Sequence, residues 1–213
     1  MKDLAGRLLY LPLDLDEKIF LWLTFKGIKP VSEITAERRG NFFSLAKRGI
    51  HRKSKYDYNS ANSRRIRGWI KDAGLVMMTN GSEWHVGKEK NKISESLKII
   101  RKFDYDNEIK SGLLFGFPKK SVEAYSHNRI VKENDQIPMM GIGVEKYENK
   151  FLKDKYYTPY ILYNVPLRNV EEDSLTAKKW ADTIRKDIPK LAKWFEKKEV
   201  NRRKKEERAQ KFL

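Results

Sequence analysis

The sequence of 213 residues predicts an α+β fold that is predominantly helical, with a β-hairpin in its N-terminal part and a short sheet in its C-terminal part. Three observations lead to this class. Apolar residues recur at helical spacing in several stretches, three of which end at glycine. An Asn80-Gly81 pair separates two apolar runs, which is the strongest local signal for a hairpin. The segment Tyr156–Val165 is aromatic and β-branched, and Pro159 favours a strand near a sheet edge.

A helix is predicted over Leu15–Lys26, after a short apolar lead-in that Pro12 interrupts. Asp14 or Asp16 would cap its N-terminus, and Gly27 would end it, since glycine enters the left-handed conformation that follows many helices at little cost. The run 19–25 is almost entirely apolar, so a buried strand is the alternative. The acidic first turn and the glycine stop favour a helix that forms part of the core.

A second helix is predicted to begin at a Thr35 cap and to run to about Arg48, with Gly49 as its end. The following loop, Ile50–Tyr58, interleaves basic and aromatic residues. Cations neutralise phosphates and aromatic rings stack on bases, so this pattern suits nucleic acid. The alternative is that the tyrosines anchor the loop to the core. The residues expected to contact nucleic acid here are Arg48, His51, Arg52, Lys53, Lys55 and Tyr56.

The most informative stretch is a basic helix predicted over Ala61–Ala73 and followed by the hairpin. Asn59-Ser60 would cap this helix and Gly74 would end it. One face is apolar (Ile66, Trp69, Ile70 and Ala73), and the other carries cations and a glycine that leaves room for close approach. In the turn Thr79–Ser82, the two central residues would adopt the positive φ of a type I′ turn. The residues assigned to nucleic-acid binding here are Arg64, Arg65, Arg67, Gly68, Lys71, Asn80 and Gly81.

The segment Asn62–Val76 (Asn-Ser-Arg-Arg-Ile-Arg-Gly-Trp-Ile-Lys-Asp-Ala-Gly-Leu-Val) and the Asn80-Gly81 turn resemble the recognition helix and wing of winged helix-turn-helix proteins. The resemblance implies a winged-helix-like, nucleic-acid-binding part over residues 1–90, with Asn80-Gly81 as the wing tip. It departs from the usual pattern in the long loop Gly49–Tyr58, where a tight turn between helices is expected.

The C-terminal half is predicted to form an α+β part over residues 105–200, followed by a basic tail over 201–213. In chain order, the predicted elements are a polar link over Lys88–Lys92, a helix over Ile93–Lys102, a turn at Asp104–Asn107, a helix from Pro118 to about Asn128, the strand at Tyr156–Val165, a helix to about Lys186 capped by Asp173 or Ser174, and a last helix that begins at Asp187 and Pro189. Trp180 and Trp194 are expected to face the core.

Two segments of this half, Gly116–Tyr125 (Gly-Phe-Pro-Lys-Lys-Ser-Val-Glu-Ala-Tyr) and Val165–Ser174 (Val-Pro-Leu-Arg-Asn-Val-Glu-Glu-Asp-Ser), are similar to two motifs of an archaeal family of unknown function. The family motifs are Gly-Tyr-Pro-x-Cys-Cys-Val-x-x-Phe and Val-Pro-Cys-x-x-x-Cys-x-x-Ser. If the family's cysteines bind metal, the resemblance implies a shared fold whose metal site is lost here. The residues that replace them are Lys120, Ser121, Leu167 and Glu171.

The net charge of +17 is concentrated in two segments. Thr35–Lys71 has eleven basic residues and two acids, and Lys190–Leu213 has ten and four, so the two segments carry +15 of the total. This concentration indicates a polyanionic partner. For the tail, where Arg202 and Arg203 are assigned to nucleic acid, a solvated helix is an equal alternative.

The composition also excludes several classes of protein. Without cysteine there is no disulfide, thiolate metal site or cysteine nucleophile, and an intracellular, cytoplasmic protein is expected. No signal peptide is recognised, and no apolar run approaches the length of a membrane span, so no membrane partner is expected. Glycine-rich phosphate loops and zinc-protease motifs are missing too.

These observations predict a non-catalytic nucleic-acid-binding protein, with DNA slightly favoured over RNA. No catalytic residue, metal ligand or cofactor is expected, and the oligomeric state stays open. One alternative is an RNA- or ribosome-associated protein. Another is a metal-dependent nuclease, because Asp135, Glu148 and Lys150 have the spacing of such sites. A third is a protein-interaction module formed by the last two helices.

Overall fold

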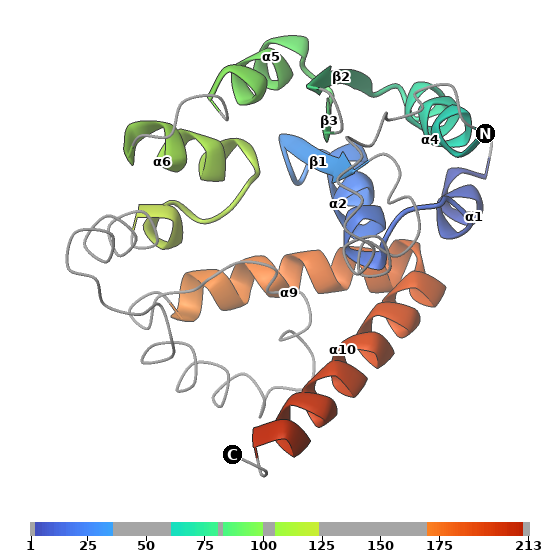
Figure 1. Ribbon diagram of the computed structural model, residues 1–213, viewed down its shortest axis with the longest axis vertical. Helices are drawn as coiled ribbons and strands as arrows, with labels where there is room; N and C mark the ends of the chain where they lie inside the picture. The colour runs from blue at the N-terminus through green and yellow to red at the C-terminus, as the bar shows by residue number, and fades with distance from the viewer. Residues whose placement is uncertain (1–2, 36–60, 81–82, 100–104, 124–169, 211–213) are drawn as a thin grey trace, which may run out of the picture. The chain divides into compact units, whose positions relative to one another are not determined.

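The computed structural model describes residues 3–35, 61–80, 83–99, 105–123 and 170–210, and the chain divides into two units, residues 1–97 and 98–213. The described residues are mostly helical and include a three-stranded antiparallel sheet (Figure 1), so the predicted fold class is confirmed. The first unit contains α1 (Leu4–Leu9), α2 (Leu15–Phe25), β1 (Val31–Thr35), α4 (Ala61–Asp72), β2 (Val76–Asn80), β3 (Glu83–Gly87) and most of α5 (Lys90–Ile99).

Helix α2 forms where its end signals predict it. Asp14 is the N-cap residue, and its backbone N–H donates to Glu17 Oε2 at 2.9 Å. Gly27 has a φ of 74°, which only glycine adopts without strain, and the helix ends two residues before it. The alternative of a strand over residues 19–25 is therefore wrong. The helix contacts β1 and β3 with an almost wholly apolar surface.

The sheet has the strand order β1-β3-β2. In the register, Val31 pairs with Gly87 across β1 and β3, and Asn80 pairs with Glu83 across β2 and β3. Strand β1 was not predicted, and Thr35 ends this strand. The sequence of this strand does not alternate between polar and apolar residues, because the polar Ser32 occupies a buried position. The Ser32 hydroxyl donates to the Phe20 carbonyl at 2.9 Å, which satisfies it in the core.

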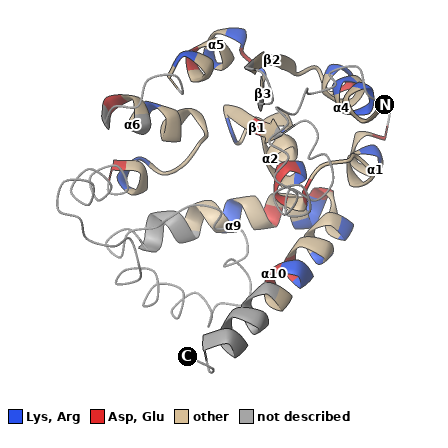
Figure 2. Ribbon diagram, in the orientation of Figure 1, with Lys and Arg blue, Asp and Glu red and all other residues tan. Residues whose placement is uncertain are grey.

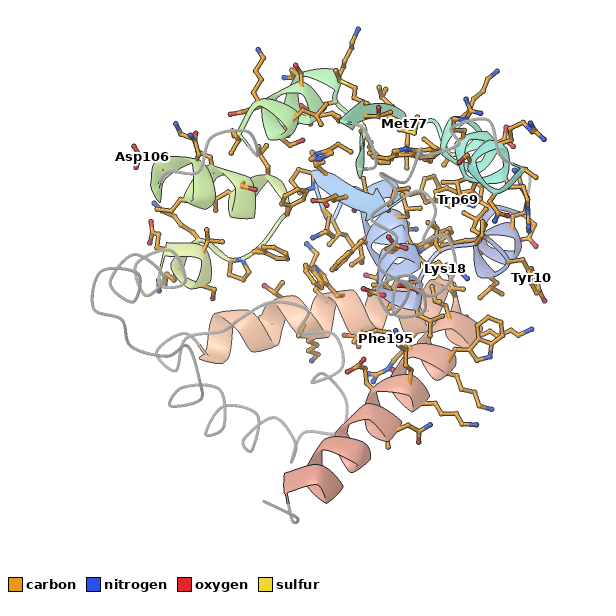
Figure 3. All side chains as sticks on the ribbon, viewed as in Figure 1. Tyr10, Lys18, Trp69, Met77, Asp106 and Phe195 are labelled. Carbon is orange, nitrogen blue, oxygen red and sulfur yellow. The ribbon has the colours of Figure 1, made fainter. Side chains whose placement is uncertain are left out.

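Three large side chains form the centre of this unit's core, namely Trp69 from α4, Trp84 from β3 and Ile93 from α5, all 1% exposed or less. Figure 3 shows Trp69 between α4 and α2. Its ring contacts Phe25 edge-on, with centroids 6.4 Å apart. The predicted apolar face of the basic helix is thus confirmed: Ile66, Trp69 and Ile70 are buried and Ala73 is half-buried.

The second unit contains α6 (Tyr105–Leu114), a short helical stretch at 119–123, α9 (Val170–Asp187) and α10 (Pro189–Gln210). The predicted turn at 104–107 is wrong from Tyr105 onward, since Asp and Asn suit the first turn of a helix as well as a turn. Pro118 precedes a helix, as predicted. Helix α5 begins at Lys90, inside the predicted polar link.

Helices α9 and α10 meet at Ile188 and pack against each other. Asp173 and Ser174 lie inside α9 instead of capping it, because the helix begins at Val170 with three acids in its first turns, where the helix dipole favours them. Trp180 is buried, as predicted. Trp194 is only half-buried, and Lys190 Nζ lies 5.0 Å from its ring centroid. Beyond Thr35, the predicted helix to about residue 48 lies outside the described residues, as do the strand at 156–165 and the nuclease-like residues.

Candidate functional site

Helix α4 is held in place by its apolar face and by one buried hydrogen bond. Trp69 Nε1 donates to the Leu4 carbonyl of α1 at 2.9 Å. This bond satisfies the indole N–H, which would otherwise be buried without an acceptor. The helix ends as the sequence predicts, because Gly74 has a φ of 68°. Its cap at Asn59-Ser60 lies outside the described residues.

Two polar contacts join the rim of α4 to α1. Arg7 Nη1 lies 2.6 Å from Asp72 Oδ2, and Arg65 Nη2 donates to the Tyr10 carbonyl at 2.7 Å. Tyr10 follows the last residue of α1, so Arg65 satisfies a carbonyl at a helix end. Arg65, predicted as a phosphate contact, therefore has a structural hydrogen bond. Asp72, the acid within α4, has its charge offset by Arg7.

The outward face of α4 carries Arg64, Arg67, Gly68 and Lys71, which fall on one side of the helix. Figure 2 shows the basic positions of α4. Arg64 and Lys71 are exposed, whereas Arg67 is half-buried. A Cβ added to Gly68 would meet no atom within 4 Å, so the surface over this glycine is open. We call these four residues the α4 basic face.

The hairpin forms next to α4, and β2 contacts that helix. Its turn lies one residue later than predicted, so each β2 residue pairs with a β3 residue two positions further along. Asn80 is the last residue of β2 and pairs with Glu83, so residues 81 and 82 separate the strands. The prediction placed Asn80 at the centre of the turn, which is wrong. The local Asn-Gly signal located the hairpin, but cross-strand packing of Met77 opposite Val86 and Thr79 opposite Trp84 fixes its register.

Several predicted contact residues have no described side chain. Arg48, His51, Arg52, Lys53, Lys55 and Tyr56 lie outside the described residues, as does Gly81. Arg202 and Arg203 belong to α10, of which only the backbone is described there. The structure thus brings together Arg64, Arg67, Gly68 and Lys71 among the described members of the predicted set.

Three buried titratable groups lie close to this unit's core and were not identified from sequence. Lys18 Nζ donates to the Leu9 carbonyl at 2.9 Å, and burial lowers its pKa although Asp14 and Glu17 oppose the shift. Burial lowers the pKa of Lys29 to about 7. Burial also lowers the pKa of His85, which is fully buried in β3.

His85 has a defined tautomer because of its partner. Ser96 Oγ donates to the Ile93 carbonyl at 2.8 Å, so its hydroxyl hydrogen is already used. His85 Nδ1, 2.8 Å from Ser96 Oγ, must therefore carry the proton and donate to that oxygen. This contact joins β3 to α5 and gives His85 a structural role in holding the hairpin.

Within the described residues, no cluster of three or more His, Asp or Glu side chains can hold a metal ion. None of the described helices is both long and apolar enough to cross a bilayer. No family model matches the chain. Neither a curated protein nor a solved structure matches it.

Proposed function

We propose that this protein binds nucleic acid without catalysing a reaction, and that the α4 basic face is its contact surface in the first unit. The observation that carries this proposal is the division of α4 into two sides. Ile66, Trp69 and Ile70 fix one side in the core, and Arg64 and Lys71 stand exposed on the other. A rigid helix that presents cations in fixed positions suits a regular row of phosphates.

Two features of this face are unfavourable for the helix by itself. Arg67 and Lys71 are four residues apart, and like charges at that spacing destabilise a helix by about 0.2–0.5 kcal/mol. A glycine inside a helix costs about 1 kcal/mol relative to alanine. Because no neighbouring atom occupies the space over Gly68, packing does not require a glycine there. A ligand that approaches the helix backbone closely accounts for both features.

The order of elements supports the winged-helix part of the proposal. A helix (α2) precedes β1, and the basic helix α4 leads directly into the hairpin β2–β3. The early strand pairs with the second strand of the hairpin, which gives the order β1-β3-β2. The recognition helix of helix-turn-helix proteins lies in the major groove, whose width of about 12 Å in B-DNA admits an α-helix.

Duplex DNA is favoured over RNA because its major groove is wide enough to admit a helix. The major groove of an A-form RNA helix is deep and narrow, and side chains on a helix do not read it. Competition between duplex DNA and a structured RNA at equal salt concentration tests this choice. Stronger competition by RNA would reverse it.

The test of the function is a salt titration with matched variants. Arg64→Ala with Lys71→Ala removes two exposed cations of the α4 basic face and leaves the half-buried Arg67 in place. The slope of log Kobs against log salt for duplex DNA should become shallower by about 1.8, because each lost phosphate contact contributes about 0.9.

The control removes two exposed cations from α5, Lys90→Ala with Lys98→Ala, which have the same charge but lie on another helix. This control should leave the slope nearly unchanged. If both doubles shift the slope equally, the protein attracts DNA through its net charge alone, and the α4 basic face is not a binding site. An unchanged slope for the Arg64/Lys71 double would also reject the assignment.

A further inference from the structure

A second set of cations lies along α10, in the other unit. Lys190, Lys193 and Lys197 are spaced three and four residues apart, and positions 204 and 208 continue the series. At 3.6 residues per turn, these five positions fall within an arc of about 60° over a length of about 27 Å. We call them the α10 basic line. The four acids of the helix fall outside that arc; they are Glu196, Glu199, Glu206 and Glu207.

The described end of this line borders a groove. Lys193 and Lys197 are both exposed, and with Arg185 of α9 they place three cations around a groove of about 500 Å³. Arg185 Nε lies 2.9 Å from Glu196 Oε1, which fixes the guanidinium at the groove wall. Glu196 also lines the groove, and the other lining residues are Pro189, Ala192 and Val200. The line thus runs beside a concave surface with a net positive lining.

The packing of α10 does not account for this arrangement. Leu191, Ala192 and Phe195 form the side of the helix that packs in the core, and they are 3% exposed or less. On the exposed side, Lys193 is followed by Lys197 four residues later, a like-charge spacing that destabilises a helix. The same spacing recurs between positions 204 and 208. Arg202 and Arg203 have glutamates three or four residues away on both sides, whereas Lys193 and Lys204 each have one, three residues ahead, and Lys197 has none.

We propose that the α10 basic line, with the groove beside it, binds the phosphate backbone of nucleic acid. The inference rests on the proposed function for the class of partner, but it places the contact on different residues and in a different unit. It also replaces the sequence-based assignment of Arg202 and Arg203, whose positions fall outside the arc by about 80° or more. The described residues of this surface are Arg185, Lys190, Lys193 and Lys197.

Nucleic acid fits this surface better than the other polyanions. Phosphates form a regular row of charges, and a straight line of cations is complementary to such a row. An interfacial membrane helix needs a broad apolar face opposite its cations, whereas the apolar face of α10 packs in the core up to Phe195 and ends at Val200. A protein partner generally anchors on aromatic or aliphatic side chains in a buried pocket, and Val200 is the one exposed large apolar residue at this groove.

The test compares two double variants of the full chain with the same loss of charge. Lys193→Gln with Lys197→Gln removes two described members of the line. Arg202→Gln with Arg203→Gln removes two cations outside it. Binding of short duplex DNA and of an RNA hairpin is measured by fluorescence anisotropy over a range of salt concentrations. The line variant should lose about 1.8 from the salt slope with at least one of these probes, and the off-line variant should keep the slope of the parent protein.

Equal changes in the two variants would overturn the proposal, because they would show general attraction to the net charge. No change in the line variant would overturn it as well. Vesicles of phosphatidylserine and phosphatidylcholine serve as a third probe. A larger loss of vesicle binding than of nucleic-acid binding would assign the line to a membrane surface instead. Far-UV circular dichroism should show equal or greater helicity in the line variant, since a like-charge repulsion is removed.

The Arg64/Lys71 double distinguishes failure of this proposal from failure of the proposed function. If only that double lowers the slope, the α4 basic face binds and the α10 basic line does not. If only the Lys193/Lys197 double lowers it, nucleic acid binds through α10 and the assignment of α4 is wrong. If each lowers the slope by about 1.8 and their combination by about 3.6, both surfaces contact phosphates.

Discussion

Replacing Lys29 with methionine should stabilise the protein. Lys29 is 2% exposed, and burial lowers its pKa from 10.5 to about 7. A difference of one pKa unit corresponds to about 1.4 kcal/mol, so folding at pH 7 costs about 4 kcal/mol on account of this ammonium group. Methionine has similar length and flexibility and carries no charge, so it can occupy the same space.

A contact with an aromatic ring offsets part of the free energy that burial of the Lys29 ammonium group costs. Lys29 Nζ lies 4.5 Å from the centroid of the Phe20 ring, and a desolvated cation–π contact contributes about 2 kcal/mol. The cost of burying the ammonium group, about 4 kcal/mol, is larger than this contribution. We therefore expect Lys29→Met to raise the free energy of unfolding at pH 7 by roughly 2–4 kcal/mol.

The sign of the pH dependence provides the decisive measurement. Between pH 7 and 10.5 the unfolded chain holds a proton on Lys29 that the folded protein has largely released, so the stability of the parent protein rises with pH in this window. Urea unfolding of parent and variant at a series of pH values should show an advantage of Lys29→Met that shrinks from pH 7 to pH 10. Lys26→Gln, an exposed lysine three residues away, is the control and should change stability by less than about 0.5 kcal/mol. An advantage for Lys29→Met that stays constant with pH would refute the reasoning.

Three further predictions concern packing and titration in the described residues. Gly68→Ala should raise the free energy of unfolding by up to about 1 kcal/mol. Gly112→Ala should lower it, because the new Cβ would lie 2.6 Å from both methyl carbons of Val122. Urea unfolding of both variants checks this contrast. Burial lowers the pKa of His85, so the free energy that the neutral imidazole contributes to stability is complete above about pH 6.5 and is lost as the pH falls toward the folded pKa. His85→Gln should remove this loss of stability in acid, as measured by urea unfolding between pH 8 and pH 5. Trp69→Phe should cost about 1–3 kcal/mol and increase amide hydrogen exchange in α1, since the Leu4 carbonyl loses its donor; unchanged exchange in α1 would contradict the role of this bond.

The sequence predicted correctly those helix ends that depend on residues close to them in the chain. Asp14 and Gly27 delimit α2, and Gly74 ends α4, because caps and left-handed glycines act within a few residues of the helix end. The buried side of α4 was also predictable, since its apolar residues follow the helical period. The Asn80-Gly81 pair located the hairpin, although the turn lies one residue later than predicted.

The elements that depend on distant partners were missed. Helix α1 has six residues and is too short to be stable alone, so its contacts with Trp69, Arg65 and Lys18 hold it. Strand β1 has a buried Ser32 whose hydroxyl acceptor is in α2. For the candidate site, the spacing of Arg64, Gly68 and Lys71 identified the exposed face. The sequence did not reveal that Arg65 donates to a carbonyl 55 residues away.

Both basic surfaces lie on a helix whose opposite side is buried. A binding role of the cations can therefore be tested separately from the folding of the helix. In α4 and in α10 the buried side of the helix provides the stability, through Trp69 and Ile66 in one and Phe195 and Leu191 in the other. Cations of each helix that are four residues apart, such as Lys193 and Lys197, repel one another. Their removal should leave each helix folded, or slightly more stable, while the salt dependence of binding falls. A surface residue that mattered for folding would show the opposite pair of effects, so stability and salt slope measured on the same variants separate a binding role from a structural one.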